Sequence, residues 1–282
     1  MLLLALSRPR QRTEWLGLIA AAVGIGVILR GTPSLVEQTS RSAAAFFAGA
    51  LVVSTLLEVE SLSSRLLFSA GAASGVTVAW FAHLGIRFTS LRASLVTEVW
   101  DSYRVMFPEL PPTPLDSATL TGMSQGSRDA LPARLSANVL AMGDLYPGIL
   151  VITALVGGWL AWGWYHRIAV RPLGPPPRPI SALRFNDHLV WALITALGLT
   201  LFTGPGTTAL VASNLLFVLG ALYWARGLAI TRYAMARLPA PPLFKVAVTA
   251  FLVLPLAFGG WLLLGVADTW LDIRRRLSPQ GV

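Results

Sequence analysis

Long apolar runs, separated by short polar stretches, extend over most of the chain. A helix needs roughly 17 to 25 residues to cross a hydrocarbon core about 30 Å thick, and seven runs meet or approach that length. The pattern predicts an all-α integral membrane protein, a bundle of about seven (six to eight) transmembrane helices. The runs cover residues 15–29, 43–57, 66–86, 149–165, 189–202, 209–225 and 246–266.

The first run follows a basic start that contains Arg8, Arg10 and Arg12. This layout is shared by secretory signal segments and by first transmembrane helices, but no small-x-small cleavage site stands directly after the run. We therefore interpret it as a retained first helix, preceded by a basic cytoplasmic N-terminus.

One large polar segment, residues 87–145, interrupts the apolar runs. Its first part, residues 90–107, places apolar side chains at helical spacing opposite Arg92, Glu98 and Asp101, as in an amphipathic helix. Such a helix lies on the bilayer surface or caps the bundle. A Pro-rich break follows, and residues 131–142 repeat the pattern more weakly. The predicted segments are the N-terminus 1–14, helices one to three in 15–86, the extramembrane segment 87–145, helices four to seven in 146–276, and the tail 277–282.

Composition supports the bilayer as solvent, because 55% of the residues are hydrophobic and 12% charged, whereas about a quarter are charged in soluble domains. The net charge of +9 comes from arginines that flank the apolar runs, where they orient helices against the membrane. We therefore expect the lipid bilayer as partner and no nucleic acid. Cysteine is absent, which excludes disulfides and thiolate metal sites.

The basic flanks place the N-terminus inside, because positively charged flanks stay in the cytoplasm. Seven spans would then put the three consecutive arginines 274–276 outside, against the same rule. The conflict indicates a count that is wrong by one: one segment is re-entrant, or one span is divided at a Gly or Pro.

Polar residues within or beside spans are the candidate functional residues, since burying them in lipid is costly. Substrate-binding candidates are Asn214, Thr207, Thr208 and Asp187. Each has a structural alternative, because an amide such as Asn214 also bonds between helices and Asp187 is placed to cap a helix. Small-residue pairs in the first span are candidates for partner docking, although such pairs occur in any packed span. These are Ala20 with Gly24 and Ala22 with Gly26.

Catalytic signatures are missing from the sequence. The three histidines, His83, His166 and His188, are scattered rather than set as His-Glu-x-x-His, and no phosphate-binding glycine loop is present. We expect no metal, no cofactor and no enzymatic activity, and any use of ATP would come from a partner.

The C-terminal third resembles the YybS-like bacterial membrane proteins, a family with a domain of unknown function. Four elements carry the resemblance: Phe185-Asn-Asp-His-Leu-Val-Trp191, Asn214, the segment Leu222-Tyr223-x-x-Arg-Gly227-Leu-Ala, and the ending from Leu264 to Arg276. The resemblance implies a multi-pass protein of the bacterial inner membrane. That family is similar, at a distance, to the S components of energy-coupling-factor vitamin transporters, which implies a small-molecule site near the outer face.

Two functions remain open. The first is a transport-type protein with a solute site around Asn214, Thr207 and Thr208. The second is a non-transporting scaffold or assembly factor that binds another membrane protein or anionic lipid. A polar cavity at Asn214 favours the first, whereas solid apolar packing there and an exposed apolar groove on residues 87–145 favour the second.

Overall fold

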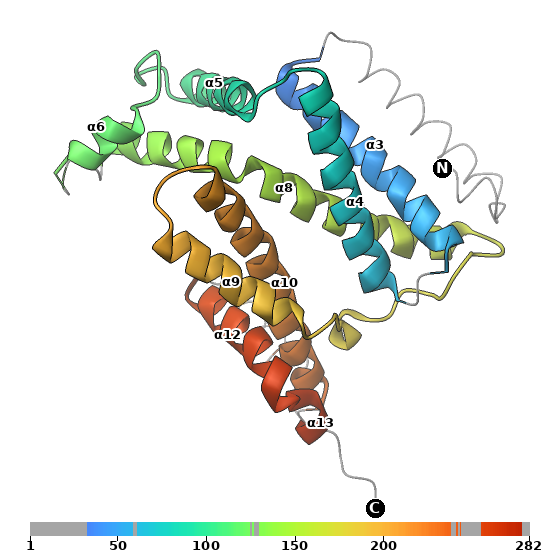
Figure 1. Ribbon diagram of the computed structural model, residues 1–282. Helices are drawn as coiled ribbons and strands as arrows, with labels where there is room; N and C mark the ends of the chain where they lie inside the picture. The colour runs from blue at the N-terminus through green and yellow to red at the C-terminus, as the bar shows by residue number, and fades with distance from the viewer. Residues whose placement is uncertain are drawn as a thin grey trace, which may run out of the picture. The chain divides into compact units, whose positions relative to one another are not determined.

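The computed structural model describes residues 33–58, 61–124, 126, 130–237, 241, 243 and 255–277, and every regular element in them is helical. The chain forms two compact units, each with its own core (Figure 1). Unit 1 is Met1–Val59 with Arg65–Gly174, and unit 2 is Glu60–Ser64 with Pro175–Val282. The boundary at residue 174 falls in the Pro-rich linker 171–179, whose prolines cannot continue a helix.

Unit 1 is built from five described helices. They are α3 (Leu35–Leu56), α4 (Leu62–His83), whose first residues belong to unit 2, α5 (Phe88–Met106), α6 (Ser117–Gly122) and α8 (Leu131–Ile168). Ser34 caps α3, its hydroxyl accepting a hydrogen bond from the Glu37 amide at 3.1 Å. Inside unit 1, the ring of Phe47 and the side chain of Leu66 close around Gly158, leaving no room for a Cβ.

The longest helix, α8, has 38 residues and is therefore about 57 Å long. This is nearly twice the thickness of a hydrocarbon core, so part of α8 extends outside the membrane. Pro147 lies inside α8 without ending it. The segment boundary predicted at residue 145 thus falls within one continuous helix.

Helix α5 packs its apolar face on the first half of α8. One core cluster joins Leu91 and Leu95 to Tyr146, and a second joins Trp100 to Val139 and Leu110. The Trp100 indole, 1% exposed, donates to the Pro111 carbonyl at 3.0 Å and thereby fixes the Pro-rich break. Helix α5 is therefore packed against α8, and its placement on the bilayer surface or as a cap of the bundle stays a prediction.

Unit 2 contains the short 3-10 helix η1 (Ile180–Ala182), α9 (Leu189–Phe202), α10 (Thr207–Arg237), α12 (Pro255–Leu271) and α13 (Ile273–Leu277). Figure 1 shows α9, α10 and α12 lying together. The closest approach joins α10 to α12, where a Cβ on Gly227 would overlap the Trp261 carbonyl and one on Gly265 the Tyr223 carbonyl. Glycine at both positions lets the two backbones touch.

Four described helices are long and apolar enough to cross a membrane, and α9 is a shorter apolar helix. The prediction of an all-helical membrane protein is therefore confirmed, whereas the count of about seven is not. Helix α9 has the bounds that the apolar run predicts, and the run 246–266 is described from Pro255 onward, as part of α12. The run 15–29, with Ala20, Ala22, Gly24 and Gly26, lies outside the described residues. The four are Leu35–Leu56, Leu62–His83, Leu131–Ile168 and Thr207–Ala236.

Candidate functional site

A buried arginine, Arg226 of α10, is the centre of an ionic cluster in unit 2. It is 4% exposed. Its Nε donates to Oδ2 of Asp268 at 3.0 Å, and a terminal nitrogen donates to Oδ1 of Asp187 at 2.6 Å. The guanidinium also lies over the ring of Phe185, 5.4 Å from its centroid. Asp268 is itself buried, so this pair is shielded from solvent, while the Asp187 side chain is 61% exposed.

Two further arginines extend the cluster. Arg184 pairs with Asp272 at 2.9 Å, and Arg274 donates to the Ser181 carbonyl at 3.1 Å. Asp272 has a left-handed backbone (φ 38°), which turns the chain between α12 and α13. Burial lowers the pKa of the Arg274 guanidinium. The three arginines and three aspartates balance in charge, so the cluster ties the segment before α9 to α10, α12 and α13 without a net charge.

The cluster assembles three of the four elements that resemble YybS-like proteins. It corrects one interpretation made from the sequence. Asp187 binds Arg226 rather than capping α9, whose N-cap residue, His188, makes no side-chain capping bond. Arg226 and Arg274 are buried within the protein, as is Arg65 of α4.

The other predicted substrate-binding residues lie elsewhere in unit 2. Thr207 and Thr208 are exposed at the start of α10. The Asn214 amide donates to the Leu210 carbonyl of its own helix at 2.9 Å. Arg226 follows Asn214 by twelve residues, about 18 Å along α10. The structure therefore does not bring Asn214 together with Asp187, and a solute site at these residues stays a prediction.

Unit 1 contains a partly open apolar cavity of about 280 Å³ between α3, α4, α8 and the start of α5. Its wall includes Phe47 of α3, Phe81 of α4 and Leu150 of α8. The remaining lining residues are Thr39, Ala43, Ala70, Ala73, Ser74, Thr77, Val78, Ala82, Ile86, Arg87, Phe88, Leu91, Tyr146, Pro147, Val151 and Ala154. None of the candidate residues chosen from the sequence lines it. Only a weak signal for this cavity was present in the sequence, the small residues in the run 66–86. Small residues indicate close helix packing as readily as a cavity.

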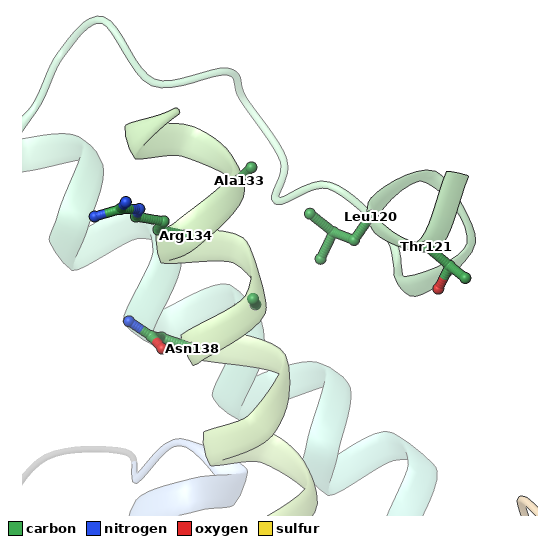
Figure 2. Close-up of a pocket in the computed structure, with 6 residues that line it drawn as sticks. Leu120, Thr121, Ala133, Arg134 and Asn138 are labelled. Carbon is green, nitrogen blue, oxygen red and sulfur yellow. The ribbon is translucent and has the colours of Figure 1, made fainter. Parts of the chain in front are cut away.

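A second hollow lies between α6 and the beginning of α8. Figure 2 shows Leu120 and Thr121 on α6 opposite Ala133 of α8, while the side chains of Arg134 and Asn138 point away from α6. Because its polar side chains do not converge, this hollow is a weaker candidate for a ligand site. Among the described residues, no group of three His, Asp or Glu side chains is placed to hold a metal.

Comparison with known proteins gives one match. The model of a family described as "Predicted membrane protein (DUF2232)" matches residues 4–269, which includes the YybS-like third and the first spans as well. No curated protein matches the chain, and no solved structure matches it.

Proposed function

Because the chain belongs to the DUF2232 family of predicted membrane proteins, we propose that it is a transport-type membrane subunit that binds a small solute. The observation that carries the proposal is the cavity of unit 1. The cavity adjoins three helices that are able to span a membrane, α3, α4 and α8, and α5 adjoins one end of it. A site of this kind accepts a solute within the bundle.

The proposal includes finer features. The protein is non-catalytic, has about seven spans and resides in the bacterial inner membrane. As in S components, a partner protein supplies the energy for transport. The absence of a nucleotide-binding loop from the sequence supports an energy source in a partner. A partner is also proposed because the sequence has small-residue pairs in its first span.

The experiment compares variants that fill the cavity with one that does not. Ala73 of α4 is buried against the cavity, so Ala73→Phe occupies its space. Native mass spectrometry of the detergent-purified protein is expected to show a small molecule retained by the wild type and absent from Ala73→Phe. Ala154→Phe, from the α8 wall, is expected to act in the same way. The matched control is Ala79→Phe, because Ala79 is exposed on the same helix.

Thermal unfolding separates loss of the solute from loss of the fold, since overpacking costs typically 1 to 3 kcal/mol without unfolding a domain. Equal retention of the small molecule by the wild type and by both folded cavity variants would overturn the proposal. Retention of no molecule at all by the wild type would do the same.

The scaffold function has less support. Its predicted docking surface, the apolar face of the segment 87–145, is covered where Leu91, Leu95 and Trp100 pack against α8. Within the described part of that segment, the exposed large apolar side chains are Val105, Met106, Phe107, Leu131 and Met142. They lie at the end of α5 and at two positions of α8 eleven residues apart, whereas a stable protein interface buries about 800 Å² per partner.

A further inference from the structure

We propose that the cavity of unit 1 binds a single-chain amphiphile with an anionic head, a carboxylate or a phosphate, and that Arg87 pairs with this head. The inference rests on the proposed function, because it names the solute class of the same cavity. It follows from which polar groups of the wall have partners and which do not.

The cavity wall has four hydroxyl-bearing residues, and all four donate their hydroxyl hydrogens elsewhere. Thr39 donates to the Leu35 carbonyl at 2.7 Å, Ser74 to Ala70 at 2.8 Å and Thr77 to Ala73 at 2.7 Å. Tyr146 donates to the Val36 carbonyl at 3.0 Å and lies 2.8 Å from the Ser40 hydroxyl. The hydroxyls therefore present no free hydrogen to a ligand, and this part of the wall suits an apolar chain.

Among the described residues that line the cavity, Arg87 is the one that carries a charge. It stands at the N-cap of α5, but its side chain makes no capping bond. The described part of the chain offers its guanidinium neither an ion pair nor a hydrogen bond. By contrast Arg92, which lies further along α5, pairs with Asp144 of α8. An exposed, unpaired guanidinium beside an apolar cavity selects a ligand that combines an anionic head with an apolar chain.

The size of the cavity limits the chain. A volume of 280 Å³ holds about nine groups of the size of a water molecule. That corresponds to a chain of roughly ten carbons with the head outside, at Arg87. The space inside the cavity therefore accommodates one apolar chain of about this length.

The test uses defined ten-carbon probes and protein in phosphatidylcholine nanodiscs, with binding to empty nanodiscs subtracted. Decanoate and decyl phosphate carry the anionic heads, decanol is the neutral probe and decyltrimethylammonium the cationic one. Charge-assisted hydrogen bonds contribute about 1.5 to 3 kcal/mol, so we expect the anionic probes to bind at least about tenfold more tightly than decanol. The head that binds more tightly identifies the source as a carboxylate or a phosphate.

The deciding variant is Arg87→Gln. It is expected to weaken the binding of decanoate and of decyl phosphate about tenfold and to leave the binding of decanol unchanged. Its matched control is Arg104→Gln, on the same helix but about 25 Å away, which is expected to bind all probes as the wild type does. Unchanged binding of both anionic probes to Arg87→Gln, or equal binding of anionic and neutral probes to the wild type, would overturn the inference.

The cavity variants keep the two proposals separable. If Ala73→Phe abolishes decanoate binding while Arg87→Gln does not affect it, the cavity binds a solute but Arg87 does not select it. If Ala73→Phe is folded and binds every probe normally, the solute site itself is wrong.

Discussion

Two buried arginines of the described chain, Arg226 and Arg65, lie against partners that stabilise their charge. Arg226 pairs with two carboxylates, those of Asp187 and Asp268, and its guanidinium lies over the ring of Phe185. In unit 1, Arg65 is also buried and lies over the ring of Trp162, 5.5 Å from its centroid. In a membrane, an ionised group without such partners would cost several kcal/mol. The pairing is thus a condition for placing these arginines in the interior.

At the residue scale, the two aspartates at the end of α12 provide a matched pair of mutations. Asp268→Asn removes the charge that faces the buried Arg226, and breaking a buried pair in this way costs about 3 to 5 kcal/mol. Asp272→Asn removes a charge from an exposed pair, which contributes about 0 to 1 kcal/mol. We therefore expect thermal unfolding in detergent to show a large loss of stability for the first variant and a small one for the second. Equal losses would contradict the assigned roles.

The sequence contained these charges but not their pairing. Arg226 and Asp268 are 42 positions apart, and a single sequence gives no register between their helices. The visible hint was one charge of each sign just after two long apolar runs. Asp187 could be selected from its place before α9, but the alternative role as a helix cap was wrong, because a capping pattern does not show which side chain a carboxylate meets across the bundle.

At the element scale, α8 shows why a local sequence pattern was insufficient to predict where a helix ends. Tyr146-Pro147-Gly148 predicts a break, since proline removes a helical hydrogen bond. The helix continues because neighbouring helices hold it: Tyr146 donates to a carbonyl of α3, and Arg92 of α5 pairs with Asp144. By contrast, α9 was predictable to the residue because Asn186 to His188 precede its apolar run and Thr203-Gly-Pro-Gly follows it.

The contact between α10 and α12 yields a prediction at this scale. Gly265→Ala places a methyl group against the Tyr223 backbone, which cannot move aside, so we expect the melting temperature to fall. Gly220→Ala, on α10, meets open space and is expected to leave stability unchanged or to raise it, because alanine favours a helix by about 1 kcal/mol over glycine. A Gly265→Ala variant as stable as the wild type would disprove the close approach.

At the scale of the whole molecule, the topology is the least predictable property. The arginine count that conflicted with seven spans included Arg274, which is buried, so only Arg275 and Arg276 of that run are exposed. Of the predicted seventh run 246–266, the structure describes the part from Pro255 onward, so the span count stays a prediction.

We expect both termini on the cytoplasmic side. Fusions of alkaline phosphatase and of green fluorescent protein after residue 282 test this, since the first is active only outside and the second fluoresces only inside. Fluorescence with no phosphatase activity is the expected result, and a fusion after residue 12 serves as the internal reference. The reverse result at the C-terminus would restore an odd number of spans.

One feature of α8 has mechanical consequences. Pro147 lacks the amide hydrogen that would bond the Gly143 carbonyl, and the same residue lines the cavity of unit 1. A rod with one weakened joint bends at that joint when a load is applied to its end. Movement of α5, which packs on the first half of α8, would therefore bend α8 at Pro147 and change the volume of the cavity that Pro147 lines.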